Sequence, residues 1–104
     1  MKQTVHKNSY KNEEPHHLYE IIDRLEENVF KYGISCKPFG IDGFSQRIRE
    51  QVSYLNRIDK WPRYFARILM YNIPGKREAR RIEREHIQDY AKKHGEKPRG
   101  NPID

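Results

Sequence analysis

LYEIID (residues 18–23) and VFKYGIS (residues 29–35) are the two stretches of sequence that decide the fold. Both are short and rich in β-branched and aromatic side chains, which favour strands. The stretch between them is short and largely polar, so the sequence predicts a β-hairpin. A loop that contains proline and glycine follows at residues 37–43.

Helix and strand patterns alternate after this loop. Residues 44–56 place apolar side chains at helical spacing, and Ser45 is a residue type suited to the N-cap. Trp61-Pro62 ends that helix, because proline cannot continue it. Residues 64–72 are largely apolar, and the sequence predicts a central strand there.

The last element is an amphipathic helix at residues 76–93, which Gly95 and Pro98 end. Its apolar face contains Ala79, Ile82, His86, Ile87 and Tyr90. The predicted order is therefore β-β-α-β-α. We expect an α+β fold, with a small three-stranded antiparallel sheet flanked by helices.

Length and charge limit the classes of function. The chain has 104 residues and a formal charge of +6. This length suits one domain, which we expect at residues 17–104 behind a flexible lead-in or linker at residues 1–16. A basic chain suggests a polyanionic partner: DNA, RNA, an anionic membrane or an acidic protein. No apolar run is long enough to span a bilayer, and the first residues do not resemble a signal peptide.

Several kinds of catalytic centre find little support. The single cysteine, Cys36, excludes an internal disulfide and fits a reducing, cytoplasmic setting. It lies next to Lys37, but a small side chain at a strand end explains it more simply than a nucleophile does. His86 and Glu83 are three residues apart on the predicted helix, too few ligands for a typical zinc site. Neither a nucleophile elbow nor a P-loop is present.

Glu83 lies in a helix segment crowded with cations, and it has two interpretations. The first is a set of salt bridges at i, i+3 and i, i+4 spacing on a solvated face. The second is a magnesium ligand at the place where a phosphodiester docks. Taken alone, the salt-bridge interpretation is the simpler.

Other positions change that balance. His17-Leu18-Tyr19 opens the first predicted strand, and Phe30-Lys31-Tyr32-Gly33-Ile34-Ser35 forms the second. Arg47 lies near the start of the first helix, Glu83 lies in the second helix, and Asn101 lies near the end of the chain. These pieces occur in the order, and on the elements, of the motifs of the GIY-YIG nuclease superfamily, which has the URI-type fold. The chain resembles that superfamily from about His17 to Asn101.

The match includes departures. The first motif keeps Tyr19 but lacks the preceding Gly-Ile, and Phe30 stands where the second motif usually has a tyrosine. Gln51 stands where some members have a histidine, one helical turn after the arginine.

The resemblance implies a metal-dependent endonuclease that hydrolyses the phosphodiester bonds of nucleic acid, with DNA favoured and RNA left open. Glu83 would hold Mg²⁺ or Mn²⁺, and Arg47 would stabilise the charge of the transition state. Either Tyr19 or Tyr32 would accept the proton of the attacking water, and Asn101 would orient the site. Flanking phosphates would be held by Lys31, Arg49, Arg77, Arg80, Arg81 and Arg84.

The same features leave other functions open. A non-catalytic nucleic-acid-binding module would use the same basic helix, and so would a basic domain bound by an acidic partner protein. A small nuclease with a flexible lead-in also resembles the toxin domain of a larger secreted bacterial protein. That resemblance implies an acidic immunity protein as partner and delivery into the cytoplasm of a target cell, with no membrane partner and no small-molecule cofactor.

Overall fold

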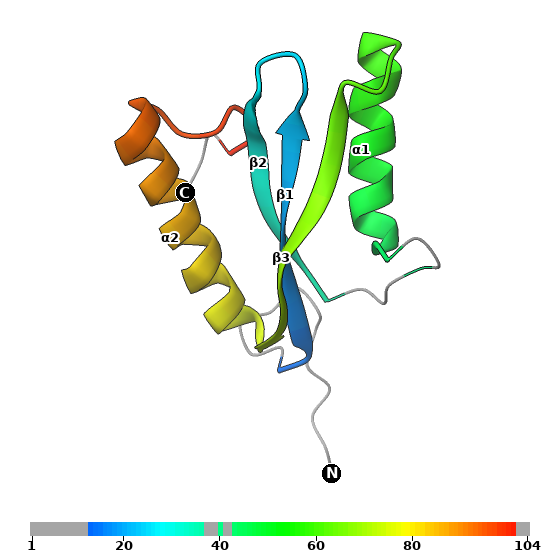
Figure 1. Cartoon of the computed structure of the whole chain (residues 1–104). Helices are drawn as coiled ribbons and strands as arrows, with labels where there is room; N and C mark the ends of the chain where they lie inside the picture. The colour runs from blue at the N-terminus through cyan, green and yellow to red at the C-terminus, as the bar shows by residue number, and fades with distance from the viewer. Residues whose placement is uncertain (1–12, 37–39, 41–42, 102–104) are drawn as a thin grey trace.

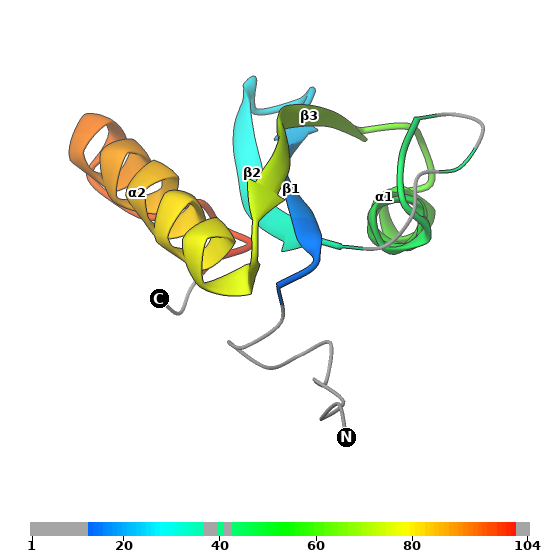
Figure 2. The ribbon, with the colours of Figure 1, turned by 90° about the horizontal axis from the view of Figure 1, so that it is seen from below.

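Two helices lie on opposite sides of a three-stranded antiparallel sheet (Figures 1 and 2). This computed structural model describes residues 13–36, 40 and 43–101. The order β-β-α-β-α and the α+β class are confirmed. The elements are β1 (Pro15–Asp23), β2 (Asn28–Ser35), α1 (Gln46–Asp59), β3 (Tyr64–Pro74) and α2 (Lys76–His94).

β1 is the central strand of the sheet, since the strand order is β2-β1-β3. Tyr19 of β1 pairs with Gly33 of β2 on one side and with Ile68 of β3 on the other. The prediction that residues 64–72 form a central strand was therefore wrong. The apolar composition of β3 did not show which strand lies at the centre of the sheet. Several apolar side chains of β3 are exposed outside the core, so its composition does not reflect a central position.

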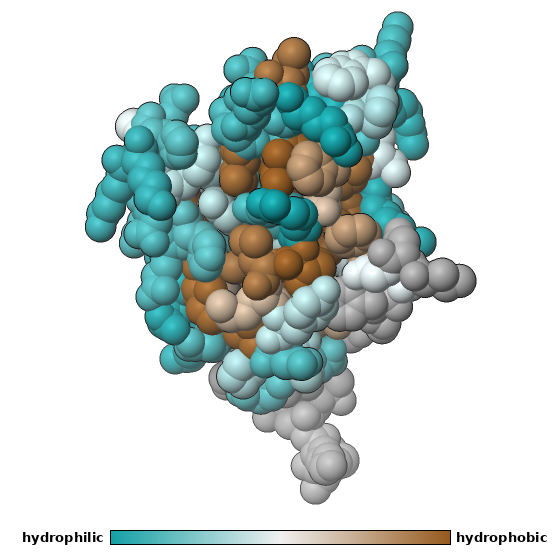
Figure 3. All heavy atoms as spheres, in the orientation of Figure 1, coloured by the Kyte–Doolittle hydropathy of each residue, from teal (hydrophilic) through white to brown (hydrophobic). Residues whose placement is uncertain are grey.

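The exposed apolar side chains of β3 follow one another along the strand. Leu69, Met70 and Tyr71 have exposed fractions of 40%, 39% and 56%. Figure 3 shows apolar side chains gathered in the middle of the face seen in Figure 1, with hydrophilic side chains around them. Some apolar side chains of the sheet are therefore packed in the core, while these three of β3 are exposed to solvent.

The side chains of β1 alternate between two small cores, as expected for a strand covered on both faces. Tyr19 and Ile21 pack with Ile48 of α1. Leu18 faces the other way and packs with Ala79 of α2. This alternation decides which helix each residue of β1 can meet.

Both helices begin and end close to the predicted positions. The Ser45 hydroxyl accepts a hydrogen bond from the backbone N–H of Ile48, which confirms it as the N-cap of α1. Lys60 ends α1 in the left-handed conformation, just before Trp61-Pro62. Gly95 ends α2 in the same conformation, which glycine adopts without strain.

Asp23 ties the end of β1 to two distant parts of the chain. Its buried carboxylate accepts two hydrogen bonds of 2.8 Å from Arg63 and another from Arg99. The backbone N–H groups of Leu25 and Glu26 also donate to it. The Arg63 guanidinium holds the pKa of the Asp23 carboxyl well below its usual range, against the effect of burial, and Arg99 adds to this.

The ends of the chain fall partly outside the described residues. The expected lead-in covers residues 1–16, of which residues 1–12 are outside the description. Pro15 and His16 belong to β1, and His16 is buried. Most of the loop at residues 37–43 also lies outside it. Within the described part of the chain, neither helix is long and apolar enough to cross a membrane.

Candidate functional site

The Tyr19 side chain crosses β2 at Gly33, the residue with which it pairs. A Cβ atom at Gly33 would lie 2.3 Å from Tyr19 Cζ and 2.4 Å from the hydroxyl oxygen. The ring therefore occupies the space that any side chain at Gly33 would need. The hydroxyl reaches α1, where it donates a hydrogen bond of 2.8 Å to Gln51 Oε1.

Two further groups influence the Tyr19 hydroxyl. Burial raises the pKa of Tyr19, and a hydrogen bond with the positively charged Arg47 opposes that rise, as does the Gln51 side chain. The negative charge of Glu83 also raises this pKa. Glu83 comes from α2, on the other side of the sheet from α1, so groups from both helices meet near this hydroxyl.

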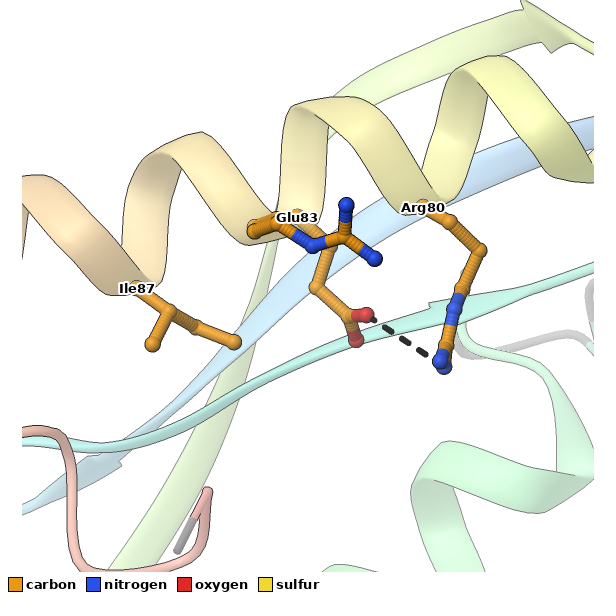
Figure 4. Close-up of a pocket in the computed structure, with 4 residues that line it drawn as sticks. Arg80, Glu83 and Ile87 are labelled. Carbon is orange, nitrogen blue, oxygen red and sulfur yellow. Dashed lines mark ion pairs between the residues drawn. The ribbon is translucent and has the colours of Figure 1, made fainter. Parts of the chain in front are cut away.

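Glu83 is a partly buried carboxylate surrounded by cations. Its side chain is 14% exposed, and its Oε1 lies 3.7 Å from a guanidinium nitrogen of Arg80. Burial raises the pKa of Glu83, while the charges of four cations lower it: Arg80, Lys31, Arg47 and Arg84. Figure 4 shows Arg80, Glu83 and Ile87 leaving α2 on the same side, with the ion pair between the first two. A pocket at this place is lined by Arg80, Glu83, Arg84 and Ile87.

Lys31 of β2 belongs to the same group of side chains. Burial lowers the pKa of Lys31, and so does the positive charge of Arg47, while Glu83 raises it. We call Tyr19, Lys31, Arg47, Gln51 and Glu83 the Glu83 cluster. Its members come from β1, β2, α1 and α2, so only the folded chain assembles it.

Tyr32 lies on the other face of the sheet from Tyr19. It pairs with Glu20, so its side chain points toward α2, and its ring centroid is 5.4 Å from that of His86. Burial raises the pKa of Tyr32, followed by the charges of Glu20, Tyr90 and Asp89. Of the two tyrosines, Tyr19 is therefore the one whose pKa responds to Arg47 and Glu83.

Asn101 binds the backbone of β2. Its Nδ2 donates to the carbonyl of Tyr32 at 2.9 Å, and its Oδ1 accepts from the N–H of the same residue at 2.8 Å. The neighbouring Gly100 N–H donates to the Phe30 carbonyl at 2.7 Å. These bonds hold the tail against β2, and they engage both ends of the Asn101 amide.

The predicted phosphate-binding cations separate into two groups. Lys31, Arg80 and Arg84 lie around Glu83. Arg81 instead pairs with Glu78 and Glu85 on an exposed part of α2. Arg49 and Arg77 are exposed on α1 and α2. Glu83 does make the expected i, i+3 salt bridge, with Arg80, and Arg81 makes pairs of the same kind on a more exposed part of the helix.

Gly33 and Gln51 are the two site residues that sequence reasoning did not select. Gly33 lies inside the second motif, and Gln51 stands where some members of the superfamily have a histidine. His17 is a third neighbour, because its ring centroid is 6.5 Å from that of Tyr19. Burial, with the charge of His16, lowers the pKa of His17 to about 4. The period-2 alternation of a strand places His17 on the face of Tyr19, so this signal was present in the sequence.

Comparison with known proteins gives one result that covers most of the chain. A family model described as URI fold toxin 2 matches residues 9–95. No match was found among curated proteins or among solved structures. The matched residues include every element from β1 to α2 and all of the Glu83 cluster. The chain belongs to the URI fold toxin 2 family.

Proposed function

We propose that this toxin domain is a metal-dependent nuclease that hydrolyses phosphodiester bonds at the Glu83 cluster. The observation that carries the proposal is that a guanidinium, Arg47, and a partly buried carboxylate, Glu83, both influence the pKa of the Tyr19 hydroxyl, which is bonded to Gln51 of the same helix as Arg47. A phosphodiester has negative oxygens to neutralise, a leaving oxygen to stabilise and a water to orient. The cluster offers one group suited to each need.

Glu83 is the residue that would hold Mg²⁺ or Mn²⁺. Magnesium sites in proteins commonly use one or two carboxylates and complete the shell with water and substrate phosphates. Among the described residues, no three His, Cys, Asp or Glu side chains gather as a ligand set, so a site built on Glu83 would be of this open kind. When bound, the ion would neutralise the charge that develops on the phosphate oxygens.

Arg47 and Lys31 would bind the phosphate itself. A guanidinium presents a planar fork of donors to phosphate oxygens. Lys31 is half-buried, and this partial burial strengthens its attraction to an anion. Arg80 and Arg84 flank Glu83 and would hold the neighbouring phosphates. Binding through these groups should weaken as salt concentration rises.

Tyr19 is the hydroxyl that would meet the attacking water. It lies in the same cluster as Arg47 and Glu83, whereas Tyr32 packs against His86 on the other face. Burial raises the pKa of the Tyr19 hydroxyl. Asn101 would act at a distance, by fixing the β2 backbone beside Lys31.

The partners follow from charge and family. Nucleic acid is the proposed substrate, with DNA preferred to RNA, in the cytoplasm of a cell that the toxin enters. An acidic immunity protein is the proposed inhibitor, because a chain with a formal charge of +6 attracts an acidic surface. Co-expression with a candidate inhibitor should restore growth of cells that produce the domain.

The experiment incubates the purified domain with plasmid, linear duplex DNA and RNA, with and without Mg²⁺. Arg47→Ala should lower cleavage by about 100-fold or more, since it removes the charge aimed at the transition state. Arg57→Ala, an exposed position on the same helix, is the matched control and should cut normally. Magnesium-independent binding without any cleavage would instead support a nucleic-acid-binding module.

A further inference from the structure

We propose that Gln51 is a positioning residue, whose amide oxygen fixes the direction of the Tyr19 hydroxyl. Its effect on cleavage rests on the proposed nuclease function, but its effect on Tyr19 does not. The Tyr19 hydroxyl donates a hydrogen bond of 2.8 Å to Gln51 Oε1, on the helix that also carries Arg47.

The Tyr19 ring has little freedom of its own. It is fully buried, it packs with Ile21 and Ile48, and it lies against the backbone of Gly33. The hydroxyl at its end has one proton and two lone pairs, and the proton turns toward the nearest acceptor. Gln51 supplies that acceptor, so it decides where the lone pairs point.

Arg47 and Gln51 are four residues apart on α1, so both side chains leave the same face of the helix. Gln51 Oε1 accepts the hydrogen bond that the hydroxyl donates. The Arg47 side chain also hydrogen-bonds this hydroxyl and lowers the pKa of Tyr19. In this proposal the remaining lone pair of the hydroxyl is the one that accepts a hydrogen bond from the attacking water. Tyr19 thereby becomes an oriented acceptor within the Glu83 cluster.

The chemistry of an amide limits what this pair does. An amide oxygen accepts a hydrogen bond but takes up no proton near neutral pH. Gln51 therefore cannot relay the proton of Tyr19, and the phenol stays neutral. In this chain Tyr19 orients the attacking water, while the proton of that water leaves to solvent.

The test compares four variants. Gln51→Leu removes the acceptor, and Gln51→Met does so with nearly the original side-chain length, should the leucine variant fail to fold. Gln51→His restores an acceptor. Gln46→Leu is the matched control, because Gln46 is an exposed glutamine on the same helix that bonds Glu50 instead.

The first measurement is the cleavage rate in two backgrounds. Gln51→Leu should lower the rate about tenfold with Tyr19 present, but less than about twofold in Tyr19→Phe, because its effect passes through the hydroxyl. Gln51→His should recover the rate that Gln51→Leu loses, because it restores an acceptor, and Gln46→Leu should stay within about twofold of the parent rate. An equal loss in both backgrounds would overturn the proposal.

The second measurement needs no enzyme activity. Carbon-13 labelling at tyrosine Cζ gives a signal for Tyr19, assigned by its loss in Tyr19→Phe. We expect this signal to shift in Gln51→Leu and Gln51→Met and to stay in place in Gln46→Leu. An unmoved Tyr19 signal would overturn the proposal. If the wild type cuts no nucleic acid, the nuclease proposal fails while the Cζ signal still decides the role of Gln51.

Discussion

The position of the Tyr19 side chain depends on single neighbouring residues, and the site depends on that position. Its ring fits because Gly33 has no side chain, and its hydroxyl is directed by Gln51. Arg47 and Glu83 then act on that hydroxyl from the two helices. Each of these residues has a separate role, so each can be tested by a single substitution.

Gly33→Ala is the most direct test of how Tyr19 is placed. The added methyl group would overlap the ring and hydroxyl of Tyr19, so the ring has to move. We expect the free energy of unfolding in urea to fall by about 1–3 kcal/mol, the usual cost of overpacking. In a Tyr19→Leu background the same change should cost much less. A loss of equal size in both backgrounds would show that the ring is not what the methyl group meets.

Sequence reasoning found part of the site at this scale. Tyr19, Arg47 and Glu83 could be selected because each occupies a recognisable motif position. Gln51 could not, since its contact with Tyr19 joins residues 32 apart in the sequence. The choice between Tyr19 and Tyr32 was also open, because it depends on which face of the sheet each residue meets, and that follows from the strand register.

At the scale of helices and strands, local signals predicted the elements but not their neighbours. Ser45, Gly95 and the helical spacing of apolar residues are features of short segments, so the bounds of α1 and α2 came close. The order of strands depends on pairing across the sheet, which no single segment encodes. The apolar residues of β3 suggested a central place that β1 in fact occupies.

Asp23 offers a test of how the elements are joined. Asp23→Ala would leave Arg63 and Arg99 without their shared carboxylate and would free the hairpin turn. We expect a loss of about 2–3 kcal/mol in the free energy of unfolding, measured in urea. Glu78→Gln, which disturbs an exposed ion pair of α2, is the control and should leave stability unchanged. Equal stability of both variants would mean that the Asp23 contacts do not hold the elements together.

For the molecule as a whole, stability should depend on pH through His17. Its pKa in the folded state is about 4, below its ordinary value of 6.5. Between these two values the unfolded chain binds a proton that the folded chain does not, so the free energy of unfolding should fall as pH drops from about 6.5 to about 4.

The measurement for His17 is urea unfolding across that pH range. His17→Phe keeps a ring at this position and removes the titrating group. The wild type should lose stability toward acid pH more steeply than this variant, and the difference should level off below about pH 4. Parallel curves for the two proteins would exclude His17 as the source of the pH dependence.

The Glu83 cluster depends on the whole folded chain, because its residues come from four separate elements. Glu83→Gln keeps the size of the side chain and removes the charge proposed to hold the metal. Glu85→Gln changes an exposed carboxylate on the same helix, where it pairs with Arg81. Comparing the two variants shows whether cleavage depends on the carboxylate of Glu83 itself or on the total negative charge of α2.

The most direct measurement is the rate of nucleic-acid cleavage in Mg²⁺ by the wild type and these two variants, on the substrate that the wild type cuts. We predict that the wild type and Glu85→Gln cut at similar rates. Glu83→Gln should be slower by at least about 100-fold while remaining folded. Cleavage by Glu83→Gln at the wild-type rate, or no cleavage of any substrate by the wild type, would contradict the account.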